Sequence, residues 1–179
     1  MFPRFTPARL SLVLFAAGAL LLPLARYAYS FNAGHPPAPM QASVTYLYLL
    51  RKTPFFTQLN TAQLRDVIAH AQEWEVRAGT PIATSGDGDG AVWILLDGGW
   101  QVEAGGKVYP ALHDEAGKWY GGAAVQGAVL PSRLVVNQHS YVMRISAGDF
   151  ARMREQGFDF DAHLRQGLAF YARILRPAG

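Results

Sequence analysis

Between residues 73 and 103, short apolar runs alternate with glycine-rich turns. The turns are Ala78-Gly79-Thr80, the segment from Ser85 to Gly90, and Asp97-Gly98-Gly99. Glycine adopts positive φ angles without steric cost, so clusters of this kind join neighbouring strands through tight turns. The runs between them have the length and periodicity of strands. The segment therefore predicts a compact β-roll.

The same patterns predict the other elements of the chain. Strands are expected over residues 73–77, 80–84, 91–96, 99–104, 106–111, 133–137 and 140–145. Helices are expected over 43–52, 61–72 and 149–156, and from Asp159 through Ile174. Asn60 and Gln63 have the spacing of a capping box. A shared apolar face is expected on the last helix at Leu164, Leu168, Tyr171 and Leu175. Core packing is expected, with a partner-facing surface as the alternative, for Trp93, Trp100, Trp119 and Tyr120.

The N-terminal segment has the composition of a membrane-targeting sequence. Arginines 4, 9 and 26 are its only charged residues up to position 30. The span from Leu10 to Phe31 covers 22 residues, which as a helix is about 33 Å long and enough to cross a bilayer. We predict an uncleaved anchor with its basic end in the cytoplasm. The alternatives are a signal peptide cleaved near Ser30 and a buried core helix.

The charge of the chain is concentrated in that segment. The protein has 16 lysines and arginines and 13 aspartates and glutamates. Because three of the arginines precede residue 30, the remainder carries 13 charges of each sign and is formally neutral. A neutral domain lacks the basic surface that a phosphate backbone requires. We therefore expect no nucleic-acid partner.

The residues give no pattern for catalysis or metal binding. The chain has no cysteine, and its five histidines lack the spacing of a zinc site. The run from Asp87 to Gly90 resembles part of a calcium loop, but it lacks the third carboxylate and the bidentate glutamate. A strand-connecting turn is the better interpretation of that run. We expect no cofactor, no metal and no enzymatic activity.

Four segments match, in order, the pattern of a known superfamily. They begin at Leu50 (Leu-Arg-Lys-Thr-Pro-Phe-Phe), at Arg77 (Arg-Ala-Gly-Thr-Pro-Ile), at Ser85 (Ser-Gly-Asp-Gly-Asp-Gly-Ala-Val-Trp-Ile-Leu-Leu-Asp-Gly-Gly) and at Met143 (Met-Arg-Ile-Ser-Ala-Gly-Asp-Phe). Together they resemble the cyclic nucleotide-binding domain superfamily, to which catabolite activator protein belongs. The resemblance covers residues 43–176. It implies a mainly β fold with flanking helices, in which a β-roll (a double-stranded jelly roll) carries the ligand site.

In that superfamily a cassette of the form G-E-x-A, followed by R-S-A, holds the cyclic nucleotide. The matching residues here are Gly121, Gly122, Ala123 and Arg133, and the resemblance makes them the candidate contacts of a ligand. Gly122 stands where the glutamate that binds the ribose hydroxyl would be. Arg133 is followed by Leu-Val instead of the small pair. The cassette is degenerate, so a cyclic nucleotide is not expected. The uncharged segment that follows, 121–130, is expected to fill the site or to dock a neighbouring subunit.

These observations predict the organisation and the role of the chain. Residues 1–31 form the anchor or signal segment, 32–42 a proline-rich tether, and 43–179 the β-roll domain. Only four residues follow Leu175, so the DNA-binding domain of the superfamily's transcription factors is not expected. We expect a non-catalytic accessory or structural subunit of a membrane complex, held in the inner membrane through residues 10–31 and contacting lipid and other subunits. The β-roll domain would be periplasmic.

The first alternative role is a periplasmic sensing module that binds a small anionic ligand or a cyclic nucleotide in the altered cassette. The second is a secreted domain released by cleavage near Ser30.

Overall fold

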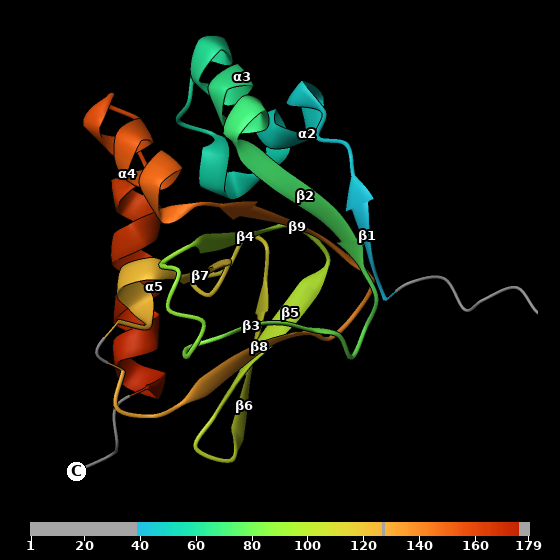
Figure 1. Cartoon of the computed structure of the whole chain (residues 1–179), viewed down its shortest axis with the longest axis vertical. Coiled ribbons are helices and arrows are strands. Elements are labelled where there is room, and N and C mark those ends of the chain that lie inside the picture. Colours follow the sequence, from blue (N-terminus) through green and yellow to red (C-terminus); the bar gives the residue numbers. More distant parts are fainter. Residues whose placement is uncertain (1–38, 127, 176–179) are drawn as a thin grey trace, which may run out of the picture. The chain divides into compact units, whose positions relative to one another are not determined.

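The computed structural model describes residues 39–126 and 128–175, which belong to one compact unit. Their nine strands form two sheets (Figure 1). The five-stranded sheet has the order β1-β2-β9-β4-β7 and contains Met40–Ser43, Ala71–Val76, Ser140–Ile145, Val92–Asp97 and Trp119–Gly121. The four-stranded sheet has the order β3-β8-β5-β6 and contains Pro81–Thr84, Ser132–Val136, Gly99–Ala104 and Lys107–Leu112.

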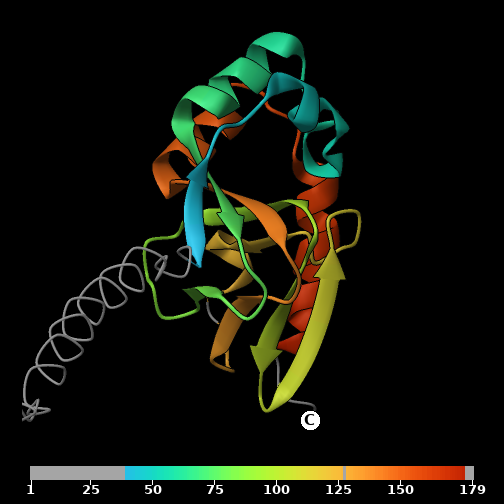
Figure 2. The ribbon, with the colours of Figure 1, turned by 90° about the vertical axis from the view of Figure 1, so that its right-hand side faces the viewer.

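The helices pack around this roll. They are α2 (Leu47–Lys52), α3 (Thr61–His70), α4 (Ala147–Glu155) and α5 (Asp161–Ile174), with the 3-10 turns η1 (Pro54–Phe56) and η2 (Gly122–Ala124). Figure 1 shows α2 and α3 together at one end of the domain, and Figure 2 shows α5 running along the roll. The predicted β-roll with flanking helices is therefore confirmed.

Local sequence signals set most of the element boundaries. At the start of α3, the Asn60 side chain accepts from the Gln63 N–H at 3.0 Å and the Gln63 side chain accepts from the Asn60 N–H at 2.9 Å. The predicted capping box is confirmed. Helix α4 begins two residues before the predicted start because the Ser146 hydroxyl accepts from the Asp149 N–H at 3.1 Å. The predicted strands from residue 73 to 145 are all present within one or two residues.

The N-terminal boundary of the domain differs from the prediction. Met40–Ser43, assigned mainly to the tether, is strand β1 and pairs with β2, with Met40 opposite Val76 and Ser43 opposite Glu73. The β-roll therefore begins before residue 43. The predicted anchor (1–31) and residues 32–38 of the tether lie outside the described residues. Within 39–126 and 128–175, no helix combines the length and the apolar character needed to span a bilayer.

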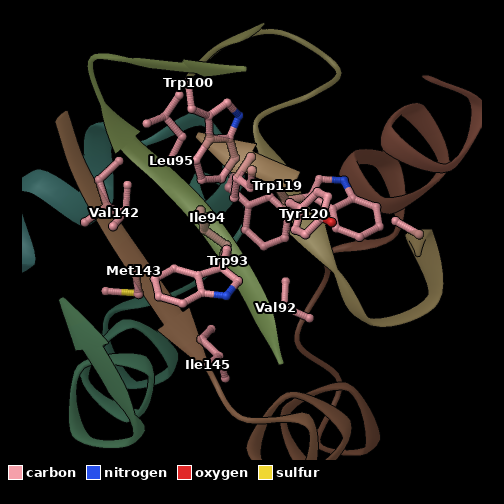
Figure 3. Packing of buried hydrophobic residues seen from close by; sticks show 14 of the residues in the cluster. Val92, Trp93, Ile94, Leu95, Trp100, Trp119, Tyr120, Val142, Met143 and Ile145 are labelled. Carbon is pink, nitrogen blue, oxygen red and sulfur yellow. The ribbon is translucent and has the colours of Figure 1, made fainter. Parts of the chain in front are cut away.

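The core lies on both faces of the five-stranded sheet. One row of register partners crosses this sheet from Glu73 through Met143 and Ile94 to Trp119. Directly opposite residues share a face, and Trp119 meets Tyr171 of α5 at a centroid distance of 5.8 Å, so this row lies on the helix-covered face. Buried aromatic and aliphatic side chains fill the rest of the core, as Figure 3 shows. The core interpretation of the four aromatic residues is confirmed.

Candidate functional site

Two glycines shape the segment that matches the ligand cassette. Gly121 ends β7 with a φ of 109°, and Gly122 begins η2 with a φ of 48°. A Cβ on Gly121 would overlap the carbonyl oxygen of Ala91, the residue directly before β4, so only glycine fits there. The Gly122 N–H donates to the same Ala91 oxygen at 3.2 Å. The cassette backbone is therefore tied to the sheet, and one of its amides is already used.

The Arg133 side chain points away from the interior of the roll. Its neighbours on β8, Ser132 and Leu134, are buried, whereas the Arg133 side chain is 56% exposed. In the register of β5 and β8, Arg133 stands directly opposite Glu103. Its Nε and its terminal nitrogen lie 3.1 Å and 2.6 Å from Glu103 Oε2. The arginine that would hold a cyclic phosphate is thus engaged by a carboxylate of its own chain.

Glu103 is held in its charged form by this contact. The hydrogen bond from Arg133, followed by one from Gln101 at 2.9 Å, lowers the pKa of the Glu103 carboxyl below its usual value. The pair remains formed at neutral pH, because a carboxyl with a lowered pKa is ionised there. An incoming anion must compete with Glu103 for the guanidinium.

Tyr120 fills part of the space between the two sheets. It lies on β7 beside the cassette glycines and is 1% exposed. Its hydroxyl lies 2.9 Å from the Ser132 hydroxyl on β8, so this contact connects the five-stranded sheet with the four-stranded sheet. Burial raises the pKa of the Tyr120 phenol, which therefore stays neutral. Figure 3 shows Tyr120 beside Trp119 on this strand.

The structure places the sequence-predicted site residues in two adjoining cavities. Gly121 and Gly122 line a cavity of about 80 Å³, and Arg133 lines another of about 1090 Å³ at the end of the four-stranded sheet. Four residues line both cavities: Thr84, Ser85, Val125 and Gln126. Ala123 lies in η2. Pockets for small molecules typically measure about 300–1000 Å³, so the cavity of about 80 Å³ is too small for a nucleotide. Gly122 also lines a third cavity, of about 420 Å³, together with Trp119 and residues of α4 and α5.

The uncharged segment after the cassette fills the site only in part. Ala124 is buried, and Val125 and Ala128 pack against the core. Val129, by contrast, is 64% exposed and lines the larger cavity together with Val108, which is 55% exposed. The larger cavity therefore combines an open apolar rim with the Arg133–Glu103 pair. Sequence reasoning identified Arg133 but missed both Glu103 and the position of Tyr120.

The carboxylates of the calcium-like run serve the turn itself. The Asp87 carboxylate accepts from the Thr84 N–H at 2.8 Å and from the Thr84 hydroxyl at 2.7 Å. Asp89 accepts from the Ala91 N–H at 3.0 Å and pairs with Arg144. These contacts agree with the interpretation of the run as a strand-connecting turn.

Comparison with known protein families and with curated proteins gives no match. Solved structures do resemble the chain. The cAMP-bound protein PfPKA-R has a TM-score of 0.57 at 15% identity, over 73% of this chain and 45% of that one. A putative cyclic nucleotide-binding protein from Geobacter metallireducens has a TM-score of 0.54 at 18% identity, over 72% and 96% of the two chains.

A third similar structure is a regulatory subunit of a cAMP-independent protein kinase A from Trypanosoma cruzi, bound to guanosine. Its TM-score is 0.54 at 15% identity, over 72% of this chain and 47% of that one. The chain thus spans less than half of both kinase regulatory proteins. At identities this low, the TM-scores establish a shared arrangement of the backbone and nothing about ligand or activity. The chain has the fold of the cyclic nucleotide-binding domain superfamily.

Proposed function

We propose that the protein is a non-catalytic accessory or structural subunit of a membrane complex and that its β-roll acts as a scaffold. The observation that carries this proposal is the engagement of Arg133 by Glu103, at 2.6 Å, on the outer face of β8. Together with the filling of the roll by Tyr120 and the glycine at position 122, it leaves the superfamily's ligand chemistry without its two charged groups. A domain that retains the fold without those groups is suited to holding other proteins.

The proposed location rests on the N-terminal segment. We propose that residues 10–31 anchor the chain in the inner membrane, with lipid around them and the β-roll in the periplasm. The support is the uncharged stretch between Leu10 and Ala25 and the arginines that precede it. A secreted form, cleaved near Ser30, is the alternative, and the mass of the mature N-terminus distinguishes the two.

Native electrophoresis of gently solubilised membranes tests both proposals. We expect the full chain to stay in the membrane pellet after carbonate washing and, after mild detergent, to migrate in a species much larger than its 179 residues allow. A chain that lacks residues 1–31 is the matched control and should leave the pellet. Migration of the full chain only as a small free species contradicts the accessory-subunit proposal. Release by carbonate contradicts the anchor.

The second candidate function is binding of a small anionic ligand, and the larger cavity favours it. That cavity is open, measures about 1090 Å³ and contains Arg133. Binding there requires the guanidinium to leave Glu103 for the ligand. The affinity for an anion should therefore fall in Arg133→Ala and rise in Glu103→Gln, which frees the arginine.

A further inference from the structure

A buried carboxylate without a hydrogen-bond partner lies below α2. Glu73 of β2 is 6% exposed, and its Oε2 atom is buried and has no hydrogen-bond partner. In the part of the chain that the structure describes, no basic group lies within 4 Å of this carboxylate. A buried acceptor that has lost its water without gaining a donor is costly, and more so when it is charged. Within the described residues nothing donates to this oxygen, so a donor that reaches it from outside them would remove this cost.

Glu73 reaches a cavity that is large enough to admit such a donor. This cavity, the α2 cavity, measures about 340 Å³ and lies between α2 and the helix-covered face of the five-stranded sheet. Glu73 lines it, whereas its neighbours Gln72 and Trp74 on β2 do not, so the Glu73 side chain forms part of the floor. The walls include the apolar groups of Leu49, Leu96 and Tyr141. An apolar cavity with one acidic group at its floor suits an apolar stem that ends in a cation.

Exposed apolar side chains lie on α2 and in the segment directly before it. We call them the α2 patch: Val44 (67% exposed), Tyr46 (63%), Tyr48 (63%) and Leu49 (45%). Leu49 belongs to both the patch and the cavity. Clusters of exposed aromatic and aliphatic residues around a pocket are typical of protein interfaces, in which an anchoring side chain enters the pocket. The α2 patch and the Glu73 carboxylate therefore indicate a surface that binds a partner with apolar groups around a cation.

The one lysine of the cavity is held at its rim. The Lys52 ammonium lies 4.3 Å from the centroid of the Tyr48 ring, on the exposed side of α2. The cation–π contact gives this ammonium a favourable position away from the floor. The cavity is also lined by Asp97 and His113, whose nearest side-chain atoms lie 4.0 Å apart. The acidic groups at the floor and wall therefore favour a cationic occupant.

We propose that the α2 cavity and the α2 patch together dock a partner protein through a lysine or arginine side chain flanked by apolar residues. The cation enters the cavity and donates to Glu73, while the flanking residues pack on Tyr48 and Leu49. This inference rests on the proposed accessory-subunit function and adds to it the surface and the chemistry of the partner. It is independent of the cassette, which lies at the other end of β4 and β7.

Methyl NMR of the full chain in phosphatidylcholine nanodiscs tests the proposal with two peptides. The probe is acetyl-Leu-Arg-Leu-amide, and acetyl-Leu-citrulline-Leu-amide is its uncharged isostere. The arginine peptide should move the methyl resonances of Leu49 and Leu96 and leave those of Leu134, in the roll, in place. A hydrogen bond between charged groups changes affinity by about ten- to hundred-fold, so the citrulline peptide should bind that much more weakly.

Two variants separate the role of Glu73 from that of surface charge. Glu73→Gln should remove the preference for arginine over citrulline, whereas Glu155→Gln, at an exposed residue of α4 outside the α2 cavity, should change affinity less than about three-fold. Equal binding of the two peptides to the unmodified chain would overturn the proposal, and this readout needs no variant to fold. Phosphatidylglycerol nanodiscs that move the same resonances equally with and without Glu73 would also overturn it, in favour of a lipid-binding surface.

The docking inference and the accessory-subunit proposal can fail independently of each other. A Glu73→Gln chain that still migrates in the large complex and shows no arginine preference overturns the docking inference alone. A chain that migrates alone but binds the arginine peptide through Glu73 retains the docking site and contradicts the membrane complex.

Discussion

Replacing Gly121 by alanine will lower the free energy of unfolding by about 2–6 kcal/mol, the combined cost of a strained backbone and an overpacked contact. The φ of 109° and ψ of −165° at this position are accessible to glycine and to almost no other residue. The added Cβ would also overlap the carbonyl oxygen of Ala91, a backbone atom directly before β4 that accepts from the Gly122 N–H. The cassette can relieve the overlap only by leaving the edge of the sheet.

Gly79→Ala is the control that measures the cost of backbone strain without the overpacked contact. Gly79 has a φ of 84° in the turn between β2 and β3, and a Cβ there would meet no atom within 4 Å. Gly79→Ala should lower the free energy of unfolding only by the cost of placing alanine in the left-handed region, about 1–2 kcal/mol. Urea denaturation of both variants in the same detergent, with tryptophan fluorescence as the signal, measures the difference between their free energies of unfolding. If Gly121→Ala lowers the free energy of unfolding no more than Gly79→Ala does, the close contact between Gly121 and Ala91 is contradicted.

Replacing Gly167 by alanine will also destabilise the domain, by about 1–3 kcal/mol and more if α5 cannot shift. The new Cβ would overlap the indole ring of Trp119, which is 1% exposed. That ring cannot rotate away freely, because its Nε1 donates to the His163 carbonyl at 2.9 Å and its edge packs on Tyr171. The substitution therefore separates α5 from β7, the strand that leads into the cassette.

Gly148→Ala provides a matched comparison within a helix. Gly148 is exposed on α4, and a Cβ there would meet no atom within 4 Å. Alanine has the higher helix propensity, so stability should be unchanged or raised by up to about 1 kcal/mol. The same denaturation experiment should give opposite or clearly different effects for the two helical glycines. Equal effects would mean that Gly167 does not contact Trp119.

The contact at Gly167 also explains one error of the helix prediction. The apolar pattern placed Leu164, Leu168, Tyr171 and Leu175 on one face, but Leu168 is 40% exposed. The buried residues of α5 are Gly167, Tyr171 and Ile174. A glycine has no apolar side chain, so a hydrophobic pattern gives it no weight, although it marks the closest approach of α5 to the sheet. Leu164 packs against the core and Tyr171 and Leu175 are buried, so the predicted face is confirmed except at Leu168.

Local signals predicted the elements that depend on neighbours in sequence. Glycine turns, the capping box of Asn60 and the periodicity of the main strands all act within a few residues, and the structure confirms them. Strand β1 was missed because its four residues are largely exposed and are defined only by pairing with residues of β2 that lie 30 to 36 positions later. Strand β7 was also missed, because its three residues are defined only by pairing with β4.

The candidate site could be predicted in its residues but not in its contacts. The absence of the cassette glutamate and the presence of Arg133 are visible in the sequence. The partner of Arg133 is not, because Glu103 lies 30 positions away and meets it only through the register of β5 and β8. Tyr120 was expected in the core, but its contact with Ser132 across the roll depends on how the two sheets face each other. Long-range strand pairing thus decides the chemistry of the site.

Calorimetric titration of the detergent-solubilised full chain with cyclic AMP and cyclic GMP tests most directly whether the roll binds a cyclic nucleotide. We expect no saturable heat from the unmodified chain, because Glu103 holds Arg133. The carboxylates that line the cavity beside Gly122, Asp87 and Asp89, are engaged by Thr84 and by Ala91 and Arg144. Glu103→Gln is the sensitised control, since it frees the guanidinium, and it should bind either nucleotide weakly at most. Micromolar binding by the unmodified chain that disappears in Arg133→Ala would contradict the account.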